Sequence, residues 1–194
     1  YFHPDVFPME DKDMWKALQD GEVLNAFQFD SEVGGRAMKK IAPKSLQELA
    51  DANGLMRLMP SEKGAEMPLD KYVRFKDNIR LWYKEMDDAG LSKTEQKILE
   101  PYFLSSYGVP PSQEQLMRML MDPNICGFSL ADANAARKIV GKKQIAKIPA
   151  LHEKVLKSAR SQLLGQYVWK NGIGPQMGYS FSLIHALAYS ILGL

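Results

Sequence analysis

Helix-start signals recur along this chain of 194 residues and constrain its fold more than any other sequence feature. Three segments, beginning at Ser45, Ser92 and Ser112, have the Ser-x-x-Glu/Gln pattern of a capping box, in which two side chains satisfy each other's backbone N–H groups. Asp11 precedes a further turn with helical apolar spacing, and Ser129 begins a weaker version of the capping signal. Between these starts, apolar residues recur at spacings of three and four, as in amphipathic helices.

The sequence therefore predicts a mainly α-helical fold, made of many short helices in an irregular arrangement with at most a little short strand. The candidate strand is segment 25–30, where apolar and polar residues alternate. Segment 72–88 mixes aromatic residues with charges of both signs, which predicts an exposed amphipathic helix. Glycine and proline mark three candidate joints between helices, at 59–64, 107–111 and 171–175.

The composition is that of an ordinary globular protein, with 45% hydrophobic and 25% charged residues. The one cysteine, Cys126, excludes an intrachain disulfide framework and indicates a reducing compartment, so we expect a cytoplasmic location. The apolar run at 183–194 is too short to span a bilayer, and the first residues lack a signal-peptide pattern. Because the chain starts without methionine and stops within an apolar helical pattern, we expect it to be a piece of a longer polypeptide.

Positive charge is concentrated in segment 137–160. This segment contains eight lysine or arginine residues and a single acid, Glu153, a local net charge of +7, whereas the whole chain carries +2. Such a field attracts nucleotide triphosphates and nucleic-acid backbones. A solvated basic helix face explains the charge density alone equally well, so the neighbouring residues have to decide between the two interpretations.

The sequence lacks the residue patterns of the common metal-binding and catalytic sites. The three histidines lie far apart and the cysteine stands alone, which gives no metal-ligand cluster. Gly141-Lys142-Lys143 is not a Walker P-loop, because the upstream glycine is missing and no serine or threonine follows. The adjacent Asp87 and Asp88 lie in a polar helix end, where a structural or solvated role is favoured over metal binding. Phosphoryl transfer needs metal-binding carboxylates as well as cations, and only the cations are evident.

Several segments match, in order, the motifs of one known family. The strings AFQFDS at 26–31, LMRLMP at 55–60, and LEP and QEQ between 99 and 115 follow the motifs VFQLES, ALxRPGP and LEPTYGxxxYQEQ. Further on, GFSLADANAARKIVGKK at 127–143 and GYSFSLIHALAY at 178–189 follow GYxLGxADxLRRAMGKK and GYGFNKSHAAAYA. By this collinear order over most of the chain, it resembles the bacterial DNA polymerase III alpha subunit, a C-family replicative DNA polymerase.

The resemblance implies a fingers-type helical region, which in the family holds the incoming deoxynucleoside triphosphate and flanks the templating base. It divides the chain into a palm-to-fingers connecting segment at 1–60, an amphipathic helical insert at 61–108, and core fingers helices with the basic stretch at 109–194. The implied nucleotide-binding residues are Arg137, Lys138, Gly141, Lys142, Lys143, Tyr179, His185 and Arg57. The candidate DNA-binding residues are Lys147, Lys154, Arg36 and Lys39.

The same resemblance implies that the intact protein is a DNA-directed DNA polymerase that uses Mg²⁺ bound by palm aspartates. We expect those aspartates upstream of this chain, which would leave the piece with no catalytic residue or metal site and inactive alone. The implied partners are primer–template DNA, deoxynucleoside triphosphates, a sliding clamp and other replisome proteins, with no membrane. Two alternatives remain: a stand-alone helical module that binds nucleic acid or protein without catalysis, and an ATP-using enzyme with an unfamiliar phosphate site.

Departures from the family pattern indicate a divergent, phage- or mobile-element-encoded branch. Lys138 replaces the second arginine of a pair and so keeps the charge but loses the planar fork of donors. Ser182 and Leu183 replace an asparagine and a lysine, so the phosphate role of that lysine is not carried over. Purely structural roles remain as alternatives to ligand binding. These are core packing for Tyr179 and His185, and a solvated surface for the lysines at 142–143 and the basic cluster at 36–40.

Overall fold

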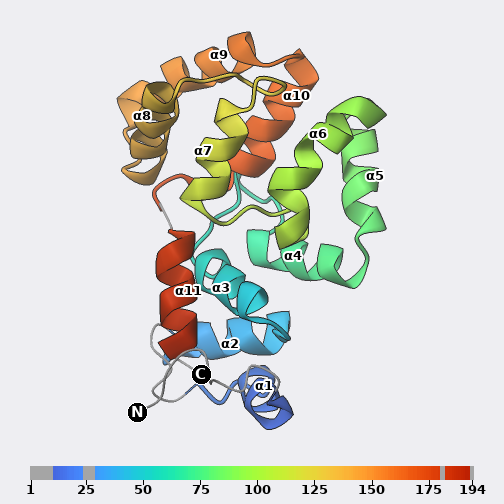
Figure 1. Ribbon diagram of the computed structural model, residues 1–194, viewed down its shortest axis with the longest axis vertical. Coiled ribbons are helices and arrows are strands. Elements are labelled where there is room, and N and C mark those ends of the chain that lie inside the picture. Colours follow the sequence, from blue (N-terminus) through green and yellow to red (C-terminus); the bar gives the residue numbers. More distant parts are fainter. Residues whose placement is uncertain (1–10, 24–28, 180–181, 193–194) are drawn as a thin grey trace. The chain divides into compact units, whose positions relative to one another are not determined.

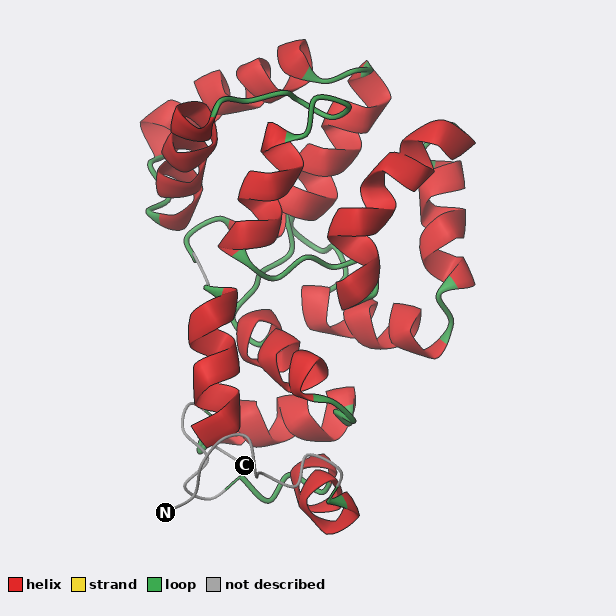
Figure 2. Cartoon of the chain, in the orientation of Figure 1, coloured by secondary structure: helices red, strands yellow, loops and turns green. Residues whose placement is uncertain are grey.

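The computed structural model describes residues 11–23, 29–179 and 182–192, and those residues form helices without a strand (Figures 1 and 2). The prediction of a mainly α-helical fold is confirmed. The candidate strand at 25–30 lies mostly outside the described residues. The chain divides into two compact units: unit 1 comprises Tyr1–Arg57 with Ser182–Leu194, and unit 2 comprises Leu58–Phe181.

Unit 1 joins the first helices of the chain to the last one. Its helices are α1 (Lys12–Gln19), α2 (Glu32–Ile41), α3 (Leu46–Leu55) and α11 (Leu183–Leu192). Helix α11 packs along α3, and α2 contacts both α1 and α3 (Figure 1). Apolar side chains such as Trp15, Met38, Leu49 and Ala186 are buried in this unit.

Unit 2 contains the rest of the helices and the whole basic stretch. Its elements are α4 (Pro68–Asp77), α5 (Arg80–Asp88), α6 (Lys93–Phe103), the short helix η2 (Leu104–Ser106), α7 (Gln113–Met121), α8 (Leu130–Gly141), η3 (Ile145–Lys147), α9 (Ile148–Ser158), α10 (Gln162–Tyr167), the π-helical η4 (Val168–Ile173) and η5 (Gly174–Gln176). Helix α7 packs between α6 and α8, and α8 also contacts α9 (Figure 1).

The predicted helix starts are found where the sequence places them. The Ser92 hydroxyl accepts the Glu95 N–H while the Glu95 carboxylate accepts the Ser92 N–H, and Ser112 forms the same reciprocal box with Gln115. Ser45 caps α3 by accepting from Glu48 N, and the Glu48 carboxylate accepts from the N–H of Lys44 at 2.8 Å. Each cap satisfies N–H groups that the first helical turn leaves unpaired.

An aromatic cluster forms the core of unit 2 and corrects the prediction for 72–88. This segment forms two helices, α4 and α5, and buries Tyr72, Phe75 and Trp82 completely, so it is not one exposed helix. The Trp82 ring stacks on Phe103 with 6.0 Å between centroids, and Trp82 Nε1 donates to the Tyr167 hydroxyl at 3.0 Å. The expected joint at 171–175 is also helical, because α10 continues through η4 into η5.

Asp122 shapes the end of α7 and the turn that leads toward α8. Its carboxylate accepts the N–H of Asn124 at 2.7 Å and the hydroxyl of Tyr102 at 2.6 Å. Burial, reinforced by the hydrogen bond to Asp122, raises the pKa of Tyr102 to about 12. Burial of Asp122 favours a higher pKa for its carboxyl, but the bonds from Tyr102 and Asn124 outweigh burial and lower that pKa.

We expect the chain to lose part of its stability in alkaline solution through Tyr102. A phenol whose pKa is higher in the folded state stabilises that state fully below its unfolded pKa of roughly 10, and the contribution is lost as pH rises through about 12. Tyr102→Phe should therefore weaken the fall in urea midpoint over this range. An alkaline pH dependence identical to that of the wild type would contradict the assignment.

Candidate nucleotide and nucleic-acid interface

Helix α8 carries the first two cations of the basic stretch, Arg137 and Lys138. Its first residues are capped by Ser129, and it buries Ala133, Ala136 and Val140. Lys138 lies on the opposite side and is exposed, whereas Arg137 is half-buried at the edge of the packed face, next to Gln113 of α7. The spacing of the small apolar residues thus fixes which side of the helix holds the cations.

Neutral side chains hold the Arg137 guanidinium in one orientation. Its Nη1 donates to Gln113 Oε1 at 3.0 Å, and Nε and Nη2 donate to Asn134 Oδ1 at 3.2 and 3.0 Å. Because both partners are amides, these bonds position the arginine without neutralising its charge. The roles of Gln113 and Asn134 were not predicted from the sequence, although Asn134 stands three residues before Arg137, a spacing that brings helical side chains together.

Helix α8 ends in a Schellman turn that has lysine where glycine is usual. The N–H of Lys143 bonds to Val140 O and that of Gln144 to Ile139 O, both at 3.0 Å, while Lys143 has a φ of +45°. A left-handed conformation costs a residue with a Cβ roughly 1–2 kcal/mol. The turn therefore fixes the backbone direction from which the Lys143 side chain leaves the helix, directly after Gly141 and the exposed Lys142.

The structure brings Tyr179 next to this turn from a distant part of the chain. The N–H of Gly178 donates to Val140 O at 2.9 Å, and the N–H of Tyr179 bonds to Gln176 O at 3.0 Å. Gly178 itself lies against the Lys143 stem, since a Cβ at that glycine would be 3.4 Å from Lys143 Cδ. The half-buried Tyr179 thus follows a segment that is bonded directly to the end of α8.

The cations of this surface fall into two groups. Lys138, Lys142, Lys143 and Lys147, which we call the basic turn, are exposed and form no ion pair with a carboxylate in the described parts of the chain. By contrast, Lys154 Nζ lies 2.5 Å from Asp132, and Lys157 is paired with Glu153 at 2.6 Å. Hydrogen bonds from Lys154 and Ser129 lower the pKa of Asp132.

Four of the twelve candidate residues lie in unit 1, and the other eight lie in unit 2. Arg36 and Lys39 are exposed on α2, where Arg36 pairs with Glu32 at 3.4 Å. Arg57 is exposed just after α3, and His185 is exposed on α11, which argues against a core histidine. The basic turn with Arg137, Gly141 and Tyr179 therefore forms the local cluster.

Within residues 11–23, 29–179 and 182–192, histidine, cysteine, aspartate and glutamate form no group of three that could hold a metal ion. Within the same ranges, every helix is too short or too polar to cross a membrane.

A comparison with known families identifies the family to which the chain belongs. The sequence model of the bacterial DNA polymerase III alpha subunit finger domain matches residues 2–162, which include α8 and the whole basic turn. The chain belongs to this finger-domain family. The resemblance seen in the sequence motifs is thereby confirmed.

Named relatives agree with the family. The chain is 41% identical over 198 residues to the probable DNA polymerase YorL of Bacillus subtilis and to a DNA-directed DNA polymerase of Bacillus phage SPbeta. It is 27% identical over 189 residues to the DNA polymerase III subunit alpha of Aquifex aeolicus. These alignments cover 95% to 100% of the chain but only 15% of each relative's length. The chain thus spans a small part of the polymerases that it matches.

Proposed function

We propose that this chain is the fingers region of a replicative DNA-directed DNA polymerase and that the basic turn binds the triphosphate of the incoming deoxynucleotide. The observation that carries the proposal is the group of exposed lysines without carboxylate partners at the end of α8, inside the part that matches the finger-domain family. Charge-assisted hydrogen bonds from such cations to phosphate oxygens are about twice as strong as neutral ones.

Each residue of the cluster has a distinct part in this proposal. Arg137 offers its remaining N–H groups from a fixed orientation, and Lys142 and Lys143 supply flexible point charges at the helix end. Gly141, without a side chain, lets a phosphate approach the backbone. Tyr179, on the segment bonded to α8, would contact the sugar or base.

The other candidates complete the proposed interface with DNA. Lys147 extends the basic turn toward a template or primer phosphate, whereas Lys154 contributes only if it leaves its ion pair with Asp132. From unit 1, Arg57 and His185 would join the nucleotide site, and the Arg36–Lys39 surface of α2 would contact the duplex backbone. These assignments follow the polymerase resemblance and the exposure of each side chain.

The remaining chemistry belongs to the intact polymerase in this proposal. Its Mg²⁺ ions would activate the primer hydroxyl and stabilise the leaving pyrophosphate, and carboxylates of a palm region outside this chain would hold them. The residues described here supply phosphate binding and orientation. The sliding clamp, other replisome proteins and a cytoplasmic location are likewise proposed for the whole enzyme, as the resemblance to the polymerase family implies.

A salt titration of DNA binding tests the proposal. Affinity of the chain for labelled primer–template DNA should fall linearly in log salt, because each phosphate contact releases counterions. Replacing Lys138, Lys142 and Lys143 together with glutamine should reduce the slope by roughly 2–3, at about 0.9 for each lost contact.

Lys157→Gln is the matched control, because it removes a charge from the same basic segment that is already paired with Glu153. We expect the control to change the slope by less than one contact, that is, by less than about 0.9. An equal slope change per removed charge in the triple variant and the control would mean that only the bulk charge matters, and would reject the basic turn as the phosphate site.

A further inference from the structure

A cavity of about 540 Å³ lies in unit 2, and the residues that line it are separate from the basic turn. Its apolar walls come from Pro60 and Ala65 before α4, Ala89 after α5, and Leu163 of α10. Lys71, Glu85, Tyr167 and Asn171 supply a polar floor. The volume is within the range of roughly 300–1,000 Å³ that is typical of small-molecule sites.

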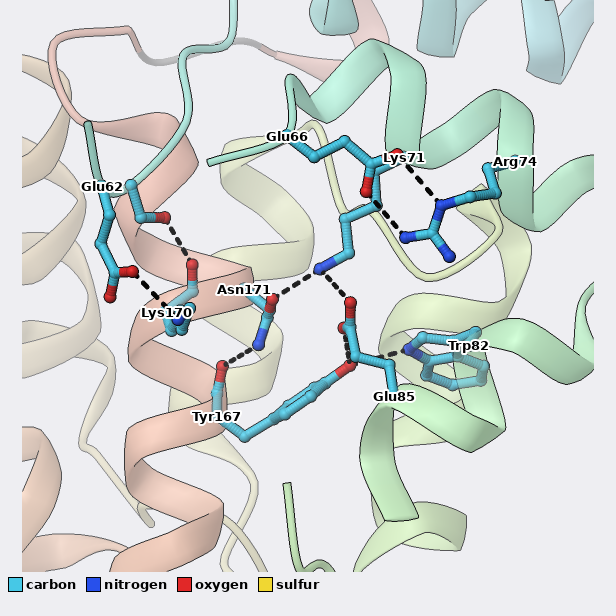
Figure 3. Close-up of polar contacts among 10 residues, drawn as sticks. Glu62, Glu66, Lys71, Arg74, Trp82, Glu85, Tyr167, Lys170 and Asn171 are labelled. Carbon is cyan, nitrogen blue, oxygen red and sulfur yellow. Dashed lines mark hydrogen bonds and ion pairs between the residues drawn. The ribbon is translucent and has the colours of Figure 1, made fainter. Parts of the chain in front are cut away.

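The polar floor is a continuous hydrogen-bonded network (Figure 3). Lys71 Nζ lies 2.7 Å from both Glu85 Oε2 and Asn171 Oδ1, and the Tyr167 hydroxyl donates to Glu85 Oε1 at 2.9 Å while accepting from Trp82. The side chains of Lys71 and Glu85 are 16% and 28% exposed, and burial raises the pKa of Tyr167 well above its usual value. Half-buried, mutually bonded groups of this kind are held in place before a ligand arrives.

The network leaves a donor and an acceptor side by side. The Lys71 ammonium has three N–H groups and uses two of them in the contacts with Glu85 and Asn171. Each oxygen of the Glu85 carboxylate accepts one bond and keeps a second lone pair. The floor therefore retains one N–H donor and an adjacent carboxylate acceptor at the point where Lys71 and Glu85 meet.

Charge pairing around the cavity disfavours an ionic ligand. Lys71 is paired with Glu85, Lys170 lies 3.1 Å from Glu62, and Glu66 pairs with Arg74 at 2.7 Å (Figure 3). With these charges matched, the cavity lacks the unpaired cations that distinguish the basic turn. A phosphate would have to break one of the ion pairs, whereas an uncharged polar group would not.

The backbone that forms one side of the cavity is unusual. Lys170 and Asn171 stand in the π-helical η4, a form that is rare and is often found at functional sites. At the end of this element, Gly174 lets the segment before α4 come close, because a Cβ there would be 2.5 Å from Ser61 Oγ. The Ser61 hydroxyl also donates to the Lys170 carbonyl, which ties the wall to η4.

We propose that this cavity binds a small, uncharged lactam, a ring that presents a C=O acceptor beside an N–H donor. The lactam oxygen accepts the free N–H of Lys71, and its N–H donates to the Glu85 carboxylate, while the ring lies against the apolar walls formed by Pro60, Ala65 and Leu163. This pairing satisfies the donor and acceptor that the network leaves open. The site is independent of the proposed phosphate-binding function, and its occupant needs no negative charge.

The test uses 2-quinolone as the probe and the Trp82 indole N–H as the reporter, because the indole is bonded to Tyr167 and through it to Glu85. In a chain with Trp15→Phe and Trp169→Phe, the remaining indole signal in a ¹H–¹⁵N spectrum belongs to Trp82. We expect a saturable shift of this signal. N-methyl-2-quinolone, which lacks the N–H donor, should bind roughly tenfold or more weakly.

Two substitutions distinguish binding in the cavity from binding elsewhere. Ala65→Phe places a large side chain at the cavity wall without adding a second indole and should abolish the saturable shift, whereas Ala150→Phe on the exposed side of α9 should leave it unchanged. Lys71→Met, checked for folding by its thermal midpoint, should weaken the probe by a similar factor to the N-methyl change. No saturable shift in the wild type, or equal affinities for probe and N-methyl derivative, would overturn the proposal whatever the DNA titration shows.

Discussion

Gly108→Ala is expected to lower the free energy of unfolding of unit 2 by roughly 2–5 kcal/mol. Gly108 has a φ of +77°, a conformation that costs an alanine roughly 1–2 kcal/mol. In addition, the new Cβ would lie 2.6 Å from Trp82 Cδ1 and 3.0 Å from Phe75 Cδ2, inside a close-packed aromatic core. Overpacking of this kind typically costs another 1–3 kcal/mol or so.

Gly64→Ala separates the two contributions. Gly64 has a φ of +84°, but a Cβ there would meet no atom within 4 Å, so this substitution measures the backbone cost without the clash. Urea unfolding followed by fluorescence in a Trp15→Phe background reports unit 2, because Trp82 and Trp169 both lie there. Equal losses in the two glycine variants would show that the ring of Trp82 moves aside freely.

Lys142→Ala combined with Lys143→Ala, placed in the complete polymerase, is expected to raise the apparent Michaelis constant for deoxynucleotides by roughly 10- to 100-fold. The two lysines are exposed at the end of α8 and have no carboxylate partner among the described residues, so their charge is available to a triphosphate. Steady-state incorporation of a single nucleotide on primer–template DNA measures the effect.

Lys157→Ala is the control for that experiment, since it removes a lysine of the same segment that Glu153 already neutralises. We expect its Michaelis constant to stay within about twofold of the wild type. If the double variant changed only the turnover number and left the Michaelis constant unaltered, the basic turn would not be the ground-state binding site of the triphosphate.

Local hydrogen bonding explains why the helix starts could be predicted. Asp11, Ser45, Ser92, Ser112 and Ser129 all serve as N-caps, as their spacing to the following residues indicates. A cap involves residues within the first turn, so its signal is contained in four consecutive positions. Distant contacts do not have to be known for such a prediction.

Segments whose structure depends on distant partners were predicted less well. The break between α4 and α5 occurs at Asn78, whose side chain accepts the N–H of Arg80 at 3.2 Å, and the aromatic residues on both sides are buried by helices far along the chain. Gly172 is a close-packing position against Met119 rather than a joint, since a Cβ there would be 2.7 Å from Met119 Cε. Neither pattern could be told from a surface helix or a loop in the sequence alone.

The candidate site was likewise predictable where its signal is local and not where it depends on distant contacts. The concentration of charge at 137–160 was evident from composition, but the pairing of Lys154 with Asp132 and the fixing of Arg137 by Gln113 depend on tertiary contacts. The cavity had no sequence signal, because Lys71 and Glu85 of the consecutive helices α4 and α5 meet Tyr167 of α10, which is 82 residues beyond Glu85.

One carbonyl oxygen, that of Val140, accepts N–H groups from both Lys143 and Gly178. The shape of the basic turn is therefore not a property of α8 alone, since a second segment of the chain, nearly forty residues further on, helps to hold it. A peptide copied from 129–147 and grafted onto an unrelated helical scaffold would transfer the charges without this outside support. Transplanting or miniaturising the surface therefore requires the segment at Gly178 as well as the end of α8.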